Sequence, residues 1–286
     1  MNIKRVACGL CAAMMLAAVA TGCGSSASSA AASSESTAAS SAAGLNGTVA
    51  TGGSTSMEKV MSALQEAYAE KGPDVTVTYD PTGSGAGITG ATDKTLDIGL
   101  SSRKLKDGET GVTATTIALD GIAIIVNNAN PVQDLTIDQI AKIATGEVTN
   151  WKDVGGEDAP IVLIGREAGS GTRDGFESIV GVADKCQYAQ ELTSTGAVIT
   201  GVAANNGAIG YASLSALKDT VKAVTVEGIA CTEETVLDGT YKIQRPFNFV
   251  TNDSVTPSDA VKSFIDFATS AEAADLIRAA GAVPMA

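Results

Sequence analysis

Histidine is absent from the whole sequence of 286 residues. Its absence excludes a Ser–His–Asp or Cys–His nucleophile and any zinc site with histidine ligands. Serine in a glycine-rich turn could still indicate a hydrolase elbow, but Thr82 stands two residues before Ser84, where that motif requires glycine. We therefore expect no catalytic activity, no metal ion and no cofactor.

Positive charge is scarce, since 19 lysine and arginine residues stand against 32 aspartate and glutamate residues, for a formal net charge of −13. Loss of Lys4 and Arg5 with an N-terminal leader would change −13 to −15. A nucleic-acid partner is therefore not expected. The bulk field would also repel an anionic ligand, so a site for one must consist of local donors aimed at one point.

Cysteine is rare as well, with five residues in the chain. Cys8 and Cys11 lie in the N-terminal leader, and Cys23 follows it directly. Cys186 and Cys231 remain in the folded part. The sequence leaves open whether these two residues form a disulfide or stay as two buried thiols.

Long hydrophobic runs are missing, and none is sufficient to cross a bilayer. The run from Val6 to Ala20 follows a short basic start and is typical of a signal peptide, which we place at residues 1–22. Cys23 follows a small residue and resembles the lipidation site of a lipoprotein, although Ala20 occupies the position where leucine is usual. The alternative is an ordinary secretory signal with an incidental cysteine.

Residues 23–45 consist almost entirely of serine, alanine, glycine and threonine. Such a segment cannot bury a core, so we expect a flexible linker between the lipidated cysteine and the folded part. A lipid on one cysteine, usually with a second acyl chain, anchors a protein stably without a spanning helix. We therefore expect a monomer held on the extracytoplasmic face of the cell membrane.

The most informative stretch begins with the apolar run 161–164 and continues through a glycine-rich turn into a helix expected over 172–180, which Gly181 could end. When a strand leads through a turn into a helix, the free backbone N–H groups of the turn and of the first helical turn are directed at one spot. The helix dipole also favours an anion there. Arg166 and Arg173 bracket the turn and can add forked donors. Taken alone, the pattern is equally compatible with a plain strand–helix connection.

The same construction occurs twice more. Residues 47–50 predict a strand, and the turn 51–56 leads into a helix. Residues 75–79 predict another strand, and the turn 82–87 follows it. Three turns rich in serine, threonine and glycine, each at the start of an expected helix, indicate one oxyanion held by all of them.

Alternating strands, turns and helices through residues 46–100 predict a parallel α/β sheet. The nearly unbroken apolar run 117–126 predicts a central strand, and the segment 127–131 is a suitable passage into a second domain. Asp97 stands inside the apolar run 96–100, which leaves two interpretations open: an acid at a surface edge, or an acid aimed at a ligand.

A longer motif, L-T-x-x-Q-I-x-x-I-x-x-G-x-x-x-N-W-x-x-V-G-G, occupies residues 135–156. Together with residues 166–172, 207–211 and 241–246, and a helix expected over 258–280, it resembles the phosphate-binding proteins of bacterial phosphate import systems. The resemblance extends from about residue 46 to the C-terminus.

The resemblance implies a two-lobed periplasmic-binding-protein fold of type II, in which two crossover strands join two α/β lobes around a ligand cleft. We expect residues 46–126 and 225–286 to form the first lobe and residues 127–224 the second. The residues that match the family's phosphate-binding positions are Thr55, Ser56, Ser84, Asp97, Arg166, Ser170, Gly171 and Thr172.

Other residues near these motifs are expected to be structural. Trp151 should pack inside its lobe, because aromatic residues are scarce here and belong to cores by default. Arg173 and Arg245 should support the fold. Arg103 stands close to the expected cleft residues, which leaves two interpretations open: a contribution to the ligand site, or a place at the surface. Asp97, in contrast, should accept a hydrogen bond from the proton of phosphate and thereby penalise sulfate, which carries none.

The resemblance further implies a solute-binding lipoprotein that captures inorganic phosphate and delivers it to the permease of an ABC transporter. One alternative is a binding protein for another tetrahedral oxyanion, such as sulfate, molybdate or tungstate. A second alternative is a phosphate-binding surface protein with a signalling or adhesion role. An enzyme acting on phosphate esters would have to work without histidine.

Overall fold

The computed structural model describes residues 45–285. The predicted signal peptide 1–22, the lipidated Cys23 and all but the last residue of the linker 23–45 lie outside the described residues. Within the described part, no helix combines the length and the apolar character that a membrane crossing needs. The elements form two α/β lobes, each with its own main hydrophobic core.

The first lobe is built on a mixed sheet. Its strands are, in spatial order, β2 (Asp74–Asp80), β1 (Asn46–Gly53), β3 (Ile98–Ser101), β11 (Gln244–Asn252) and β4 (Val112–Asn127). β1 pairs in parallel with both of its neighbours, as the alternating pattern predicted. Antiparallel pairing enters with β11, which lies between β3 and β4, and with the short β12 (Val283–Pro284) beside β4.

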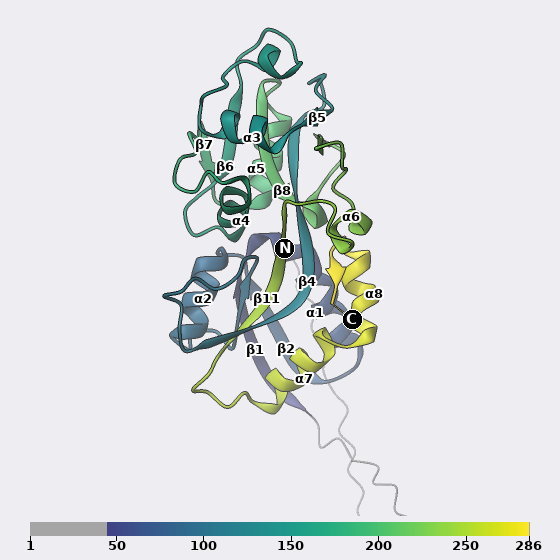
Figure 1. Cartoon of the computed structure of the whole chain (residues 1–286). Helices are drawn as coiled ribbons and strands as arrows, with labels where there is room; N and C mark the ends of the chain where they lie inside the picture. Colours follow the sequence, from purple (N-terminus) through teal and green to yellow (C-terminus); the bar gives the residue numbers. More distant parts are fainter. Residues whose placement is uncertain (1–44, 286) are drawn as a thin grey trace, which may run out of the picture. The chain divides into compact units, whose positions relative to one another are not determined.

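Helices cover both faces of this sheet (Figure 1). They are α1 (Glu58–Glu70), α2 (Ser84–Thr92), α7 (Asp259–Ala268) and α8 (Ala271–Ala279), and a 3₁₀ turn, η1 (Thr55–Met57), precedes α1. The single helix expected over 258–280 is wrong. Thr269 and Ser270 bond back to carbonyls of α7, and Ser270 then caps α8 by accepting a bond from Ala273 N.

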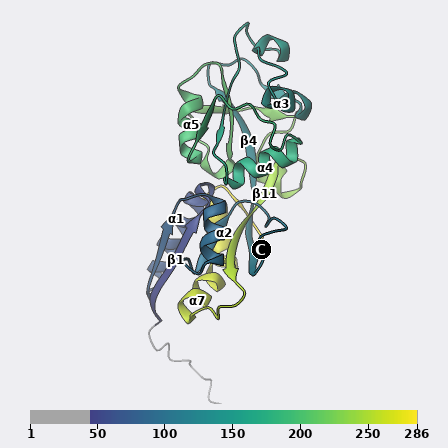
Figure 2. The ribbon, with the colours of Figure 1, turned by 90° about the vertical axis from the view of Figure 1, so that its left-hand side faces the viewer.

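The second lobe has its own sheet, which shares β4 with the first. Its strands are β4, β8 (Ala208–Ser213), β6 (Val162–Arg166) and β7 (Gln190–Leu192), with β9 (Val221–Ala223) also paired to β4. Its helices are α3 (Ile137–Ala144), α4 (Gly171–Val180), α5 (Thr195–Ala203) and α6 (Glu233–Leu237). α3 and α5 lie on opposite sides of the sheet (Figure 2). The smaller elements are β5 (Asp134–Leu135), paired with β10 (Thr225–Val226), and the 3₁₀ turns η2 (Trp151–Val154) and η3 (Leu214–Ala216).

Two local predictions in the second lobe are confirmed, the end of a helix at Gly181 and the burial of Trp151. α4 ends at Gly181, whose φ of 77° is left-handed and suits glycine. Trp151 is buried in the core, and its Nε1 donates to Gly207 O at 2.9 Å. α3 begins with a capping box, in which Thr136 Oγ1 accepts a bond from Gln139 N.

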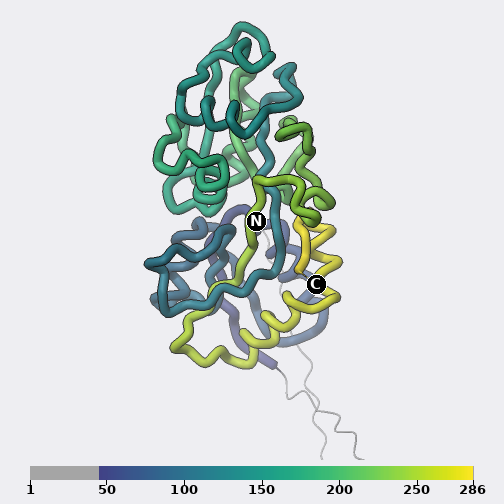
Figure 3. Tube along the Cα trace, viewed as in Figure 1, coloured from purple at the N-terminus to yellow at the C-terminus, as the bar shows by residue number. Residues whose placement is uncertain are grey.

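Two chain segments join the lobes (Figure 3). β4 is one strand of 16 residues, which pairs with β11 in the first lobe and with β8 in the second. The chain returns at Ile243, whose carbonyl accepts a bond from Ile122 N at 2.7 Å. The boundary expected at residue 224 therefore needs correction, because Val236 and Tyr241 still pack in the second-lobe core.

Candidate anion-binding site

Five strands, β1, β2, β3, β6 and β7, end where the two lobes meet. A turn rich in serine, threonine or glycine follows the carboxyl end of each one, and ligands of open α/β sheets bind at carboxyl ends. We define the candidate site as ten buried residues from these strand ends, turns and helix starts. They are Ser54, Thr55, Ser56, Ser84, Ser102, Arg166, Ser170, Gly171, Thr172 and Thr195.

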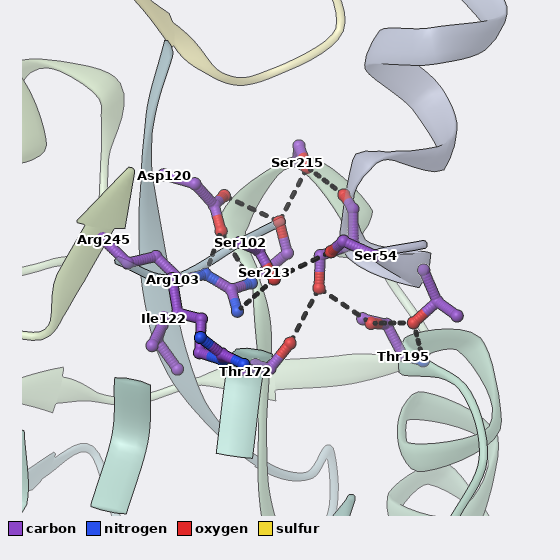
Figure 4. A network of polar contacts seen from close by, with 12 residues as sticks. Ser54, Ser102, Arg103, Asp120, Ile122, Thr172, Thr195, Ser213, Ser215 and Arg245 are labelled. Carbon is purple, nitrogen blue, oxygen red and sulfur yellow. Dashed lines mark hydrogen bonds and ion pairs between the residues drawn. The ribbon is translucent and has the colours of Figure 1, made fainter. Parts of the chain in front are cut away.

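Hydroxyl groups of the first lobe contact hydroxyl groups of the second in this site (Figure 4). Ser56 Oγ lies 2.8 Å from Thr172 Oγ1 and 3.0 Å from Thr195 Oγ1. Thr55 Oγ1 lies 3.1 Å from Thr195 Oγ1. The lobes therefore bring together every predicted site residue except Asp97.

Arg166 is the charged side chain of the candidate site, and only 1% of the residue is exposed. Its Nη1 donates to Thr55 Oγ1 at 2.8 Å, and its Nε and Nη2 donate to backbone carbonyls of the second lobe. The one carboxylate paired with it among the described residues, that of Glu167, is 3.9 Å away. Burial lowers the pKa of Arg166 to about 10. This buried cation is therefore poorly compensated by the protein itself.

The backbone of Arg166 is held by side chains of its own lobe. Its N–H donates to Tyr211 Oη at 3.0 Å, and Tyr211 Oη lies 3.0 Å from Tyr188 Oη. Arg173 Nη1 donates to the carbonyl of Arg166 at 3.1 Å, while Arg173 Nε pairs with Glu177. The structural role predicted for Arg173 is confirmed. Tyr211 and Arg173 together hold the backbone of Arg166 in place.

The amino ends of three helices, α2, α4 and α5, meet in the site, and α2 and α4 face each other directly. Gly85 N in the first turn of α2 donates to the carbonyl of Gly169 at 2.9 Å, and Ser170 Oγ caps α4. A Cβ at Gly171 would lie 2.4 Å from Ser84 Oγ, so no other residue fits here without a shift. Helix amino ends carry partial positive charge and free N–H groups, which together favour an anion.

Sequence reasoning missed three residues of the site: Ser54, Ser102 and Thr195. Ser54 directly precedes a predicted residue, and Ser102 follows the carboxyl end of β3. Thr195 starts α5 after β7, within Thr193-Ser194-Thr195-Gly196, which repeats the Ser/Thr/Gly pattern of the other turns. The signal was therefore present in the sequence at all three positions.

The prediction for Asp97 is wrong. This residue is exposed, and its Oδ2 accepts a bond from Ala50 N at 2.8 Å. It stands before the first residue of β3, at the amino end of a strand whose carboxyl end leads to Ser102. A parallel strand presents only its carboxyl end to the ligand side, so Asp97 lies on the wrong side of the sheet.

Of the two interpretations of Arg103, the surface one is wrong. The residue is buried, and its guanidinium bonds Glu109 at 2.6 Å and Asp174 at 2.8 Å. Lys106 Nζ also lies 2.9 Å from Asp174. Because Asp174 belongs to α4, these ion pairs join the two lobes beside the candidate site.

Arg245 has the structural role predicted for it. Arg245 on β11 and Asp120 on β4 face each other in the sheet register and form an ion pair at 2.9 Å, with both side chains buried (Figure 4). Ser213, at the end of β8, donates to the second oxygen of Asp120 at 2.6 Å. The pair therefore lies at the junction where β4 passes from one lobe to the other.

Other chemistry has little support in the described part of the chain. No group of three or more aspartate, glutamate or cysteine residues within 45–285 is arranged to hold a metal ion. Cys186 and Cys231 are free thiols, which answers the question that the sequence left open. Burial raises the pKa of the Cys186 thiol to about 11, so it is no activated nucleophile.

Known proteins resemble this chain over most of its length. The model of a family described as the PBP superfamily domain matches residues 29–272. The phosphate-binding protein PstS of Borreliella burgdorferi is 31% identical over 82% of this chain and 88% of its own length. PstS of Bacillus subtilis is 31% identical over 78% of this chain and 75% of its own length.

Solved structures give the same result. A structure from Clostridium perfringens, described as a phosphate ABC transporter substrate-binding protein with bound phosphate, is 42% identical and has a TM-score of 0.79. It matches 84% of this chain and 100% of its own. An ABC-type phosphate transport receptor from Vibrio cholerae is 36% identical with a TM-score of 0.69, over 82% of this chain and 99% of its own.

Proposed function

We propose that this chain, which belongs to the PstS family of phosphate-binding proteins within the PBP superfamily, captures inorganic phosphate between its lobes and delivers it to an ABC transporter. The phosphate ligand is supported by the names of its relatives and by phosphate bound to the similar C. perfringens protein. The two-lobed fold supports capture by closure of one lobe on the other.

One observation carries the proposal: Arg166 is a buried cation without a close carboxylate, surrounded by hydroxyls and helix amino ends from both lobes. All of these groups can donate a hydrogen bond. Phosphate supplies the acceptor oxygens and the negative charge that this arrangement needs. The site offers no nucleophile–base pair, so we propose binding without catalysis.

Calorimetry of the mature protein, purified free of phosphate, tests this proposal. Inorganic phosphate should bind with one ion per chain and should raise the melting temperature, because ligand that binds the folded state alone stabilises it. Absence of both binding heat and thermal shift would reject phosphate as the ligand.

The position of Asp97 favours a second candidate, a site for another tetrahedral oxyanion. With Asp97 outside the site, the candidate residues include no carboxylate that would repel sulfate. Serine and threonine hydroxyls can accept the proton of phosphate, but they can equally donate to sulfate. Competition titrations of phosphate against sulfate, molybdate and tungstate decide between these ligands.

The remaining parts of the proposal concern the cell. We propose a monomer that is lipidated at Cys23, is held by the linker on the extracytoplasmic face of the membrane, and meets the permease of the transporter there. The sequence before residue 45 supports the anchor, and the description of the V. cholerae relative as an ABC-type phosphate transport receptor supports the meeting with a transporter.

A further inference from the structure

A chain of hydrogen bonds leads from the crossover strands into the candidate site (Figure 4). Arg245 directs Nε and Nη2 at Asp120 Oδ2, at 3.1 and 2.9 Å. Its remaining Nη1 donates to Ser102 Oγ at 3.1 Å. The guanidinium thus contacts a serine of the site while its charge is balanced by Asp120.

The hydroxyl of Ser102 has only one direction left for its own hydrogen. A serine oxygen has two lone pairs and one hydrogen. One lone pair accepts from Arg245, which can only donate, and the other accepts from Ser54 Oγ at 2.7 Å. The hydrogen of Ser102 must therefore point to its third neighbour, Ser84 Oγ, at 3.2 Å.

The same count applies to Ser84. Its oxygen accepts from Ser102 N at 3.0 Å and, by the argument above, from the hydroxyl of Ser102. Both of its lone pairs are then used, and its hydrogen remains. Ser84 starts α2 directly against Gly171, where the amino ends of α2 and α4 meet.

We propose that Arg245 is a positioning residue for anion binding: through Ser102 it fixes the hydroxyl hydrogen of Ser84 as a donor directed at the ligand. This inference rests on the proposed function and goes beyond it, because Arg245 itself does not touch the ion. Because its hydroxyl is a donor, Ser84 should bond an unprotonated oxygen of phosphate. Fixed donors need no reorientation when the ion arrives, and a charged donor polarises the hydroxyls that follow it.

Asp120 completes the arrangement by holding Arg245 in place. Two of the three donor groups of the fork are committed to Asp120 Oδ2, and Ser213 occupies Asp120 Oδ1. Ser213 also lies 2.7 Å from Ser215, whose hydroxyl donates to the carbonyl of Ser56. The ion pair of Arg245 with Asp120 therefore orients the hydroxyl of Ser102 without adding net charge to the site.

A double-mutant cycle on the mature protein tests the energetic part of the inference. Arg245→Lys keeps a charge facing Asp120 but removes the fork that also reaches Ser102. Ser102→Ala removes the relay. Each single variant should weaken phosphate binding by at least about tenfold, the lower end of the range for a hydrogen bond to a charged group. The double variant should be no weaker than Ser102→Ala alone, because Arg245 acts through Ser102.

The control is Arg278→Lys, an exposed arginine paired with Asp275, which should leave affinity unchanged. Melting temperatures without phosphate separate damage to the fold from loss of binding. Losses that multiply in the double variant would overturn the inference, as would unchanged affinity in Arg245→Lys.

Neutron diffraction of the ligand-free, deuterium-exchanged protein tests the geometry without any ligand. The deuteron of Ser102 should point to Ser84, and that of Ser84 should point away from Ser102. The reverse orientation would overturn the inference even if phosphate binds. If the wild-type protein fails to bind phosphate, the proposed function falls, and the deuteron positions still decide the role of Arg245.

Discussion

At the scale of single residues, Arg166 is the buried charged side chain of the candidate site. We expect Arg166→Ala to lose roughly 2 to 4 kcal/mol of phosphate binding, the range for truncating one side of a buried charge pair. The fold should persist, because the variant removes a buried charge with no close counter-ion. Calorimetry measures the loss, and Arg278→Ala at the surface is the control. Unchanged affinity would remove Arg166 from the site.

The pKa of Arg166, near 10, also predicts an alkaline limit to binding. Below that pH the guanidinium is charged before the ion arrives. Above it, binding must also restore a proton, so the affinity should fall by about tenfold per pH unit. The fold itself should not lose stability through Arg166 as the pH rises. Its pKa is lower in the folded state than in the unfolded state, so deprotonation above about pH 10 relieves the cost of burying the charge. Titrations from about pH 8 to pH 11 should show this break, and constant affinity throughout would contradict it.

The residues of the site could be predicted where a local sequence pattern marks a turn before a helix. Thr55, Ser84 and Gly171 stand in glycine turns at helix starts, and the chemistry of a helix amino end is local. Asp97 was predicted wrongly because an acid in an apolar run does not reveal on which side of the sheet it will lie. The bonds of Arg245 could not be predicted, because they depend on the pairing of β11 with β4, strands far apart in the sequence.

At the scale of elements, the contact between α2 and α4 should limit how closely the lobes approach. Gly171→Ala would place a methyl group 2.4 Å from Ser84 Oγ and 2.7 Å from Ser102 Oγ. We expect the variant to bind phosphate at least about tenfold more weakly, although alanine favours helices. Gly196→Ala in the first turn of α5 is the matched control, since nothing lies within 4 Å of its Cβ. Equal affinities of the two variants would contradict the prediction.

The ion pairs of Asp174 with Arg103 and Lys106 should favour the arrangement in which the lobes touch. Asp174→Asn should weaken phosphate binding by about 1.5- to 5-fold, as expected for a partly exposed pair. The fold should tolerate the change because Arg103 keeps Glu109. Asp138→Asn, in an exposed pair within α3, is the control. If the affinity of Asp174→Asn equals that of the wild type at low salt, the ion pairs do not contribute to closure.

Among the elements, the periodic ones could be predicted and the breaks between them could not. The strand–turn–helix order of the first lobe and the cap of α3 follow from local sequence. The division of the C-terminal helix at Ser270 depends on short serine and threonine bonds to the backbone, which compete with helix geometry. The lobe boundary depends on which core Tyr241 enters, and that is a tertiary property.

At the scale of the whole molecule, the proposed anchor lies before residue 45, whereas the candidate site lies entirely after it. Location and ligand binding can therefore be tested independently. Cys23→Ala should release the protein into the medium, because a single cysteine carries the proposed anchor. The released protein should bind phosphate as tightly as the anchored one, since the described residues contain the entire candidate site. Metabolic labelling with a fatty acid gives the direct measurement, and a wild-type protein without label would refute the anchor.

The place of β11 between β3 and β4 also bears on the order in which the chain folds. The second lobe is made of continuous sequence, whereas the first lobe needs a strand that is synthesised after the second lobe is complete. We expect the second lobe to reach its native state earlier. The sheet that contains β1 and β3 should become stable only after β11 has paired with β3. Pulse-labelling hydrogen exchange during refolding would show late protection in β3, and early protection there would refute this order. A newly secreted chain would thus complete the sheet of its first lobe only after β11, which begins at Gln244, has left the membrane.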